Sequence, residues 1–154
     1  MSNIIFETYD KKYNKELNTW QSKENQAGYD GLNEFVVARG TLLGDYLTFT
    51  CEQLDDIKVK LAFKDNALVG FVAYSRQSQE HIHIEIMGIN PECRGQGLSA
   101  EMLQEFKKQI FKNPNIKQLT LAVKNSNKSG IRAFSKVGIL SSEQKNNGYI
   151  SFDL

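Results

Sequence analysis

Three consecutive segments between Ile57 and Ile89 show the two-residue repeat of β-strands, and this feature constrains the fold most. In "KVKLAFK", "ALVGFVAYS" and "HIHIEIMGI", apolar residues alternate with others or form short runs. Alternation of this kind is typical of strands with one buried face. Asp65-Asn66 and the polar run "RQSQE" separate the segments, and both links are short enough for hairpins. The pattern predicts three strands in an antiparallel meander.

The segments on either side predict a mixed α/β protein. Ile4–Thr8 predicts a strand, and helical spacing of apolar residues predicts a helix over Lys11–Gln21, which "QSKENQAGYDGL" then breaks. Leu32–Leu54 predicts one or two helices, interrupted near Gly40 or Gly44. The downstream pattern predicts a helix from Leu98 to near Asn113-Pro114, a strand over Leu119–Val123, a helix from about Asn127 stopped by Gly138, and a closing strand in "GYISFDL".

Length and composition favour one ordinary globular domain spanning residues 1–154. The 19 basic and 18 acidic residues give a net charge of +1, which argues for neither nucleic acid nor a membrane as a partner. No apolar run approaches the ~20 residues of a membrane span, and the N-terminus is no signal peptide. Cys51 and Cys93 form no disulfide framework and no metal-ligand spacing, so we expect a cytoplasmic protein without a metal.

The stretch "NPECRGQGLSAEML" places a glycine-rich turn directly before a helix, an arrangement that suits an anion. "GQGLSA" matches the dinucleotide pattern G-x-G-x-x-A, but two features exclude that interpretation. Residues 90–94 separate the turn from its strand, and the next strand ends in Val123-Lys124-Asn125, without an acidic residue for a ribose. No Gly-Lys-Ser/Thr follows, which excludes a Walker loop. For an isolated glycine pair, a structural turn that binds nothing is the alternative.

Two motifs in this region resemble the GNAT acetyltransferase superfamily. Its phosphate-binding signature is [Q/R]-x-x-G-x-[G/A], and Arg94, Gly97 and Ser99 occupy the first, fourth and sixth positions, with Ser99 a small departure. The later stretch "LAVKNSNKSGIRAFSKVGI" is similar to the strand, asparagine, helix and Lys-x-Gly ending of the family's second half. The resemblance covers roughly Ile57–Leu154. It implies a mixed, mostly antiparallel twisted sheet with a splayed central strand pair, flanked by helices.

The resemblance implies acetyl-CoA as the cofactor, with coenzyme A as the product. The turn would hold its pyrophosphate through backbone amides and the helix N-terminus. The strand before the turn would carry a bulge, tolerated by Gly88, and pair with the pantetheine, while an N–H near Met87 would act on the thioester oxygen. The implied cofactor-binding residues are Met87, Gly88, Ile89, Arg94, Gly95, Gln96, Gly97, Leu98, Ser99, Asn127 and Phe134.

The alternation in "HIHIEIMGI" predicts that Ile82, Ile84 and Ile86 share the core face and that His81, His83, Glu85 and Met87 share the other. The resemblance places Met87 beside the acetyl group, and by register from Arg94 it places His83 where some family members have a catalytic glutamate. It thus implies His83 and Glu85 as the candidate catalytic residues, each able to relay the amine's proton or, for Glu85, to hold a cationic substrate. The alternative is a polar sheet surface without a catalytic role.

Phe134 departs from the family, in which the second helix often carries a tyrosine that protonates the departing thiolate. Phenylalanine cannot donate a proton, so the thiolate would leave unassisted or through water. Two functions follow. The first is an N-acetyltransferase that transfers acetyl directly to a primary amine. The alternative is an acyl-CoA-binding sensor or partner module with little turnover, which Phe134 favours.

The family builds its acceptor pocket between its first two helices, where this chain has Tyr29, Asp30 and Glu34. A solvated surface loop is the alternative for these residues, and Trp20 is expected in the core. The acceptor, a small-molecule or peptide amine, stays open. Family members commonly dimerise, so a homodimer stays open as well.

Overall fold

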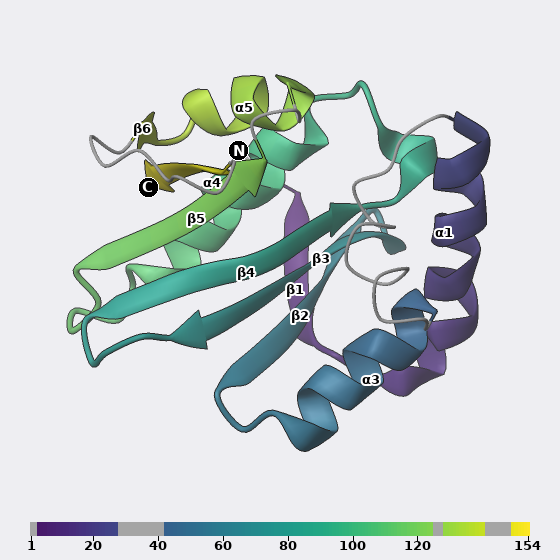
Figure 1. The fold of residues 1–154 in the computed structure, drawn as a ribbon, viewed down its shortest axis with the longest axis horizontal. Helices are drawn as coiled ribbons and strands as arrows, with labels where there is room; N and C mark the ends of the chain where they lie inside the picture. Colours follow the sequence, from purple (N-terminus) through teal and green to yellow (C-terminus); the bar gives the residue numbers. More distant parts are fainter. Residues whose placement is uncertain (1–2, 28–41, 125–127, 141–148) are drawn as a thin grey trace.

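The computed structural model describes residues 3–27, 42–124, 128–140 and 149–154, and its strands form one seven-stranded sheet in the order β1-β2-β3-β4-β5-β7-β6 (Figure 1). All neighbouring strands are antiparallel except β4 and β5, which are parallel. The expected mixed, mostly antiparallel sheet is confirmed. The strands are β1 (Ile4–Thr8), β2 (Ile57–Lys64), β3 (Ala67–Arg76), β4 (His81–Ile89), β5 (Gln118–Lys124), β6 (Ile139–Leu140) and β7 (Tyr149–Asp153).

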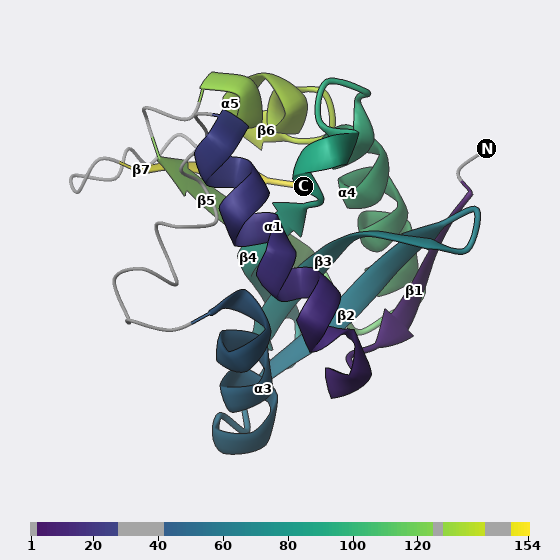
Figure 2. The same ribbon diagram turned by 90° about the vertical axis from the view of Figure 1, so that its right-hand side faces the viewer.

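Helices cover both faces of the sheet (Figures 1 and 2). On one face lie α1 (Asn14–Ala27) and α3 (Leu43–Gln53), and on the other lie α4 (Leu98–Ile110) and α5 (Lys128–Ser135). Two 3-10 turns, η1 (Lys11–Tyr13) and η2 (Pro91–Cys93), precede α1 and α4. None of the helices in the described part of the chain combines the length and the hydropathy that a membrane crossing requires.

The sheet separates two hydrophobic clusters, which define its two faces. The α1/α3 face buries Leu17 and Trp20 of α1 and Leu47 of α3, and the indole side chain of Trp20 is 0% exposed. Trp20 is therefore a core residue, as expected. The α4/α5 face buries the apolar stripe of α4, which confirms the amphipathic helix: Leu98, Met102, Leu103 and Phe106.

The β2–β3 hairpin forms as the alternation predicts. Asp65 and Asn66 have φ angles of +53° and +67°, the pair of left-handed residues that a type I′ turn requires. Asparagine and aspartate adopt this conformation more readily than other residues that carry a Cβ. The link from β3 to β4 is also short, so the predicted three-stranded meander is confirmed.

The predicted end of the first helix was wrong. Helix α1 continues through Gln21 to Ala27, because "QSKENQA" contains only residues that a helix tolerates and the first glycine follows it. The expected interruption near Gly40 or Gly44 agrees with the start of α3, which follows the extended Leu42, and Gly44 itself is the second residue of that helix. A Cβ on Gly44 would lie 2.7 Å from the Cβ of Asn14, so glycine permits the close contact between α3 and α1. Residues 28–41, which include Gly40, lie outside the described residues.

The role assigned to Gly138 also differs. Helix α5 ends at Ser135, and Gly138 does not have a positive φ. A Cβ at this position would lie 2.4 Å from Cδ2 of Leu154 and 2.6 Å from the carbonyl oxygen of Asp153. Gly138 therefore allows the chain after α5 to approach the end of β7, and a left-handed helix stop is not its function.

Candidate active site

The central strands β4 and β5 pair over only part of their length. Their parallel register joins His81 to Gln118 and ends with Ile84 opposite Leu121. Beyond this point β4 continues to Ile89 while β5 continues to Lys124 with β7 along its other edge, and the two ribbons diverge in Figure 1. The expected splayed strand pair is thus present, and it opens towards the end of β4 that leads into the glycine-rich turn.

A bulge in β4 lies at Glu85, not at Gly88 as expected. Tyr74 of β3 pairs with Ile84 and Ala73 pairs with Ile86, so Glu85 is the extra residue. A bulge places two successive side chains on one side of a strand and reverses the alternation that follows. Glu85 keeps the face predicted for it, beside His83, and the predicted distribution of side chains is wrong from Ile86 onwards.

The bulge moves Ile86 and Met87 to opposite faces from those predicted. Ile82 and Ile84 belong to the α4/α5 cluster, whereas Ile86 belongs to the α1/α3 cluster. Met87 is half-buried against the α4/α5 cluster. The side chain of Met87 consequently does not share a face with His83. The N–H of Met87 belongs to the backbone, and the bulge leaves its assignment to the thioester oxygen as a prediction.

The turn after β4 has the geometry of an anion-binding loop. Gly95 and Gly97 have φ angles of +79° and +72°, which glycine adopts without strain, and a Cβ at either position would meet nothing within 4 Å. The space beside both glycines is therefore open. The first intrahelical bond of α4 joins the amide of Glu101 to the carbonyl of Gly97, so the amides of Leu98, Ser99 and Ala100 have no acceptor within the helix.

The segment between β4 and this turn is itself ordered by hydrogen bonds. Asn90 accepts a bond from the amide of Glu92 through Oδ1 (3.1 Å), and Pro91 begins the short η2 helix. The amide of Asn90 bonds to the carbonyl of Val69 in β3 (2.8 Å). The glycine turn is thus held at a fixed distance from the sheet.

The residues predicted to bind the cofactor divide into anchors and accessible groups. Gly88, Ile89 and Leu98 are buried and hold the segment in the core, while Arg94 and Ser99 are half-buried. Gly95, Gln96 and Gly97 are exposed. Asn127 lies outside the described residues, as do all three predicted acceptor residues, Tyr29, Asp30 and Glu34.

His83 is held by a residue that the sequence reasoning did not single out. Nδ1 of His83 lies 2.7 Å from Oγ1 of Thr120, and Nε2 of His81 lies 2.7 Å from the same oxygen. Thr120 is on β5, where it is the register partner of His83. The alternation of Leu119, Leu121 and Val123 marks Thr120 as a position on the opposite face, but only the strand pairing places it against the histidines.

Glu85 has a separate partner. The hydroxyl of Ser75, which is 2% exposed, donates to Oε1 of Glu85 at 2.5 Å, and Nε2 of Gln77 donates to Ser75 Oγ at 2.6 Å. Ser75 is also the register partner of His83. The structure therefore brings the two predicted catalytic residues together on one face, with a hydroxyl beside each. A serine at an inward position of "FVAYSR" was the signal for this contact.

Neither cysteine is set up as a nucleophile. Burial raises the pKa of the Cys93 thiol, with the nearby Glu92 carboxylate adding to the shift. Partial desolvation is the largest cause of the raised pKa at Cys51, although this residue is exposed on α3. Both thiols are thus mainly protonated near neutral pH.

Phe134 is half-buried and packs edge-on against Phe152, with ring centroids 6.1 Å apart. The neighbouring Ser135 donates its hydroxyl to the carbonyl of Ile131 at 2.7 Å. Neither of these two residues therefore serves as a proton donor to a thiolate.

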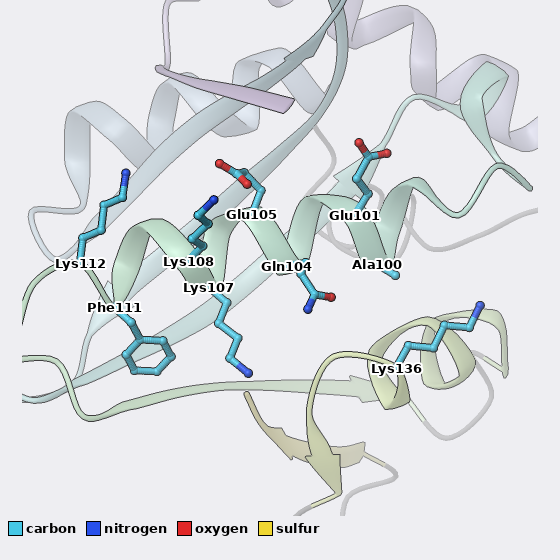
Figure 3. Close-up of a pocket in the computed structure, with 9 residues that line it drawn as sticks. All are labelled: Ala100, Glu101, Gln104, Glu105, Lys107, Lys108, Phe111, Lys112 and Lys136. Atoms are coloured by element: carbon cyan, nitrogen blue, oxygen red, sulfur yellow. The ribbon is translucent and has the colours of Figure 1, made fainter. Parts of the chain in front are cut away.

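A hollow of about 960 Å³ lies on the outer side of α4, facing Lys136 (Figure 3). It is lined by Ala100, Glu101, Gln104, Glu105, Lys107, Lys108, Phe111, Lys112 and Lys136. None of the predicted site residues within the described part of the chain lines it. The hollow is therefore separate from the strand split and the polar row of β4.

Comparison with known proteins agrees with this geometry. The sequence model of the acetyltransferase (GNAT) family matches residues 13–139. The fold is shared with the Campylobacter jejuni N-acetyltransferase PseH in complex with acetyl coenzyme A (TM-score 0.69, 12% identity, 98% of this chain and 97% of that chain). It is shared with the PaiA N-acetyltransferase of Thermoplasma acidophilum in complex with coenzyme A (0.68, 18%, 99% and 98%). No curated protein matches the sequence.

A third structure is the aminoglycoside acetyltransferase AAC(6')-Ib with coenzyme A and kanamycin (TM-score 0.72, 14% identity, 98% of this chain and 94% of that chain). At these identities the structures establish the fold. The family match spans most of the sequence, and the chain belongs to the GNAT family of acetyltransferases.

Proposed function

We propose that the chain is an acetyl-CoA-dependent N-acetyltransferase, formed by residues 1–154 as one domain, that acetylates a primary amine directly. The observation that carries this proposal is the alignment of two features at one end of β4. The split between β4 and β5 opens towards Ile89, and the open glycine turn begins six residues later at Gly95. A long ligand with an anionic group can occupy both at once.

The turn suits the pyrophosphate of acetyl-CoA. The space that a Cβ would occupy at Gly95 and Gly97 is open, and the amides of Leu98, Ser99 and Ala100 lie at the positive end of the α4 dipole. From Glu85 to Ile89, the edge of β4 that faces away from β3 has no strand partner among the described residues and offers backbone groups to the pantetheine. Proteins with this fold have been crystallised with acetyl-CoA or coenzyme A, which supports the same ligand here.

Bound acetyl-CoA supplies an activated acetyl group, and the residues of β4 would act around it. The backbone N–H of Met87 would donate to the carbonyl oxygen, a contact that contributes about 2.7–4 kcal/mol in comparable oxyanion sites. His83 or Glu85 would accept the proton that the amine loses as it attacks. Because no cysteine is activated, transfer proceeds without a covalent enzyme intermediate.

Calorimetric titration with acetyl-CoA tests this function, with Ser99→Glu and Ser99→Ala as a matched pair. A carboxylate in the first turn of α4 favours the helix but repels phosphate. We therefore expect micromolar binding by the wild type, similar binding by Ser99→Ala, and a loss of at least about tenfold by Ser99→Glu at undiminished melting temperature. Absence of binding by the wild type would refute the proposal.

An acyl-CoA sensor or partner module with little turnover is the second candidate. Phe134 favours it, because it occupies the place of a thiolate-protonating tyrosine and is packed against Phe152. A screen of primary amines with acetyl-CoA separates the two functions. Binding accompanied by release of free coenzyme A thiol supports the enzyme, whereas binding without release for any amine supports the sensor.

The acceptor amine of the reaction is to be identified by experiment. Proteins with this fold include acetyltransferases described for spermidine, for aminoglycosides and for the N-terminal serine of a ribosomal protein. The screen should therefore contain polyamines, aminoglycosides and short peptides. The net charge of +1 favours none of these classes.

A further inference from the structure

The hydroxyl of Thr120 lies between two imidazole rings and contacts both. Its Oγ1 is 2.7 Å from Nδ1 of His83 and 2.7 Å from Nε2 of His81, and the two ring centroids are 6.5 Å apart. Each distance is that of a good hydrogen bond. The three side chains therefore form one chain of hydrogen bonds across β4 and β5.

The hydrogen count in this cluster restricts the protonation states. A threonine hydroxyl has one proton to donate and two lone pairs to accept with. The two ring nitrogens that face Thr120 cannot both be unprotonated, because only one can receive the hydroxyl proton. Either His83 donates through Nδ1 and Thr120 donates to His81, or the direction is reversed, or both rings donate.

We propose that Thr120 is a positioning residue that accepts from Nδ1–H of His83 and donates to Nε2 of His81, so that His83 carries its lone pair on Nε2. This inference rests on the proposed function, because only this direction makes Nε2 of His83 the basic nitrogen. In the transfer, a C–N bond would form between the amine and the acetyl carbon, the C–S bond of the thioester would break, and coenzyme A would leave as its thiolate with the electron pair of that bond. The N–H bond of the amine would break as well, its proton joining Nε2 of His83 and its electron pair staying on the amine nitrogen. Nδ1–H remains bonded to Thr120 throughout.

The place of the cluster in the sheet supports this role. His83 and Thr120 are register partners in β4 and β5, and the pairing ends with the next pair, Ile84 and Leu121. The three side chains thus lie at the closed end of the strand split, beside the unpaired segment proposed to bind the pantetheine. Thr120 is β-branched and lies in a paired strand, which restricts its side-chain rotation.

Neutral His81 is the better partner for a charged His83. Two imidazolium ions at this separation would repel each other, whereas a neutral ring that accepts from Thr120 polarises the hydroxyl towards His83. Among the described residues on this face, Glu85 is held by Ser75, and Asp153 is the register partner of Thr120.

The test is ¹⁵N nuclear magnetic resonance of the histidine side chains in the full chain, comparing wild type, Thr120→Val and Thr120→Ser. At a pH where both rings are neutral, we expect His83 as the Nδ1–H tautomer and His81 with an unprotonated Nε2. Valine is similar in shape and suits a strand but cannot bond, so both rings should lose this preference in Thr120→Val. Thr120→Ser, which retains the hydroxyl, should restore it.

Three results would overturn the inference: His83 with an unprotonated Nδ1, both rings protonated at the nitrogens facing Thr120, or tautomers unchanged by Thr120→Val. These readouts require neither acetyl-CoA nor an amine. A wild type that fails to bind acetyl-CoA refutes the proposed function while the tautomers can still be as expected. Normal acetyl-CoA binding with reversed tautomers refutes only the role of Thr120.

Discussion

The two halves of β4 are adjacent in sequence but differ in their pairing with β5 and in the faces on which their side chains lie. From His81 to Ile84 the strand pairs with β3 and with β5, and its isoleucines lie on the α4/α5 face. From Glu85 to Ile89 it pairs with β3 alone, and Ile86 lies on the α1/α3 face. Residues 81–84 are the closed half, because both edges of the strand are paired there. Residues 85–89 are the open half, because among the described residues the edge towards β5 has no strand partner.

This difference assigns a separate task to each half. The closed half fixes the imidazole rings through contacts with β5, because side-chain chemistry requires fixed positions. The open half leaves backbone groups without a strand partner on the β5 side, which suits an extended ligand that pairs as a strand does. The bulge at Glu85 is the boundary between the two. The following predictions test this difference between the two halves.

The largest expected effect is on Gly70, which supports the open half from β3. A Cβ here would lie 2.6 Å from the carbonyl oxygen of Gly88 and 2.6 Å from Sδ of Met102. Because the carbonyl oxygen belongs to the backbone, Gly70→Ala should lower the free energy of unfolding by about 1–3 kcal/mol in urea denaturation. Ala67→Gly, an exposed change in the same strand, is the control, with an expected loss of about 0.5–1 kcal/mol. Equal losses would show that the close contact is unimportant.

The placement of Ile84 and Ile86 on opposite faces predicts additive effects. Ile84→Val and Ile86→Val should each lower the free energy of unfolding by about 0.5–1.5 kcal/mol. Because the two side chains belong to different clusters, the double variant should equal the sum to within about 0.5 kcal/mol. A larger coupling in urea denaturation would indicate that they share a face, as unbroken alternation requires.

Ser75 and Glu85 should be coupled across the bulge. The serine hydroxyl donates to a carboxylate, so Ser75→Ala should destabilise the wild type more than it destabilises the Glu85→Gln variant. Because Glu85 is exposed and water can replace the serine, we expect a coupling free energy of only about 1 kcal/mol in a double-mutant cycle. A coupling of zero would show that the bulge is held by backbone pairing alone.

The smallest expected effect concerns Cys93, which follows the open half. Its raised pKa keeps the thiol protonated, so alkylation at pH 8 should be slower than that of a free cysteine. The unfolded thiol ionises first as the pH rises, so this group's contribution to stability is complete below the ordinary thiol pKa. This contribution to stability is lost as the pH rises from the ordinary thiol pKa through the raised pKa of folded Cys93. Mass spectrometry of alkylated peptides over pH 7–10 measures the rate.

Acetyl-CoA provides an internal comparison in the same experiment. Ligand at the turn should slow alkylation of Cys93 but not of Cys51, which is exposed on α3. Equal rates with and without acetyl-CoA at both cysteines would contradict binding beside Cys93.

Elements defined by short-range patterns could be predicted from the sequence. The Asp65-Asn66 turn, the three strands of the meander and the apolar stripe of α4 depend on neighbours a few residues away, and the structure has all of them. The end of α1 and the role of Gly138 could not be predicted. The first depends on the absence of a real helix breaker before Gly28, and the second on contact with Leu154, which is distant in sequence.

The candidate site was predictable only in part. His83, Glu85 and the turn from Arg94 to Ser99 stand out by residue type and spacing, and the family match agrees with the fold they imply. The faces of Ile86 and Met87 were predicted wrongly, because a bulge arises from the register between two strands and leaves no period of its own in the sequence. Ser75 and Thr120 look like ordinary strand residues until their register partners are known.

The meander, the glycine turn and the amphipathic helix that follows it are encoded locally, since each results from short-range spacing and backbone preference. The point where β4 separates from β5, the reversal of its alternation, and the hydroxyl that contacts each candidate catalytic residue depend on the assembled sheet. Separation along the chain explains this difference. Thr120 lies 37 residues from His83, and two strands so far apart meet in a register that depends on the packing of the whole sheet.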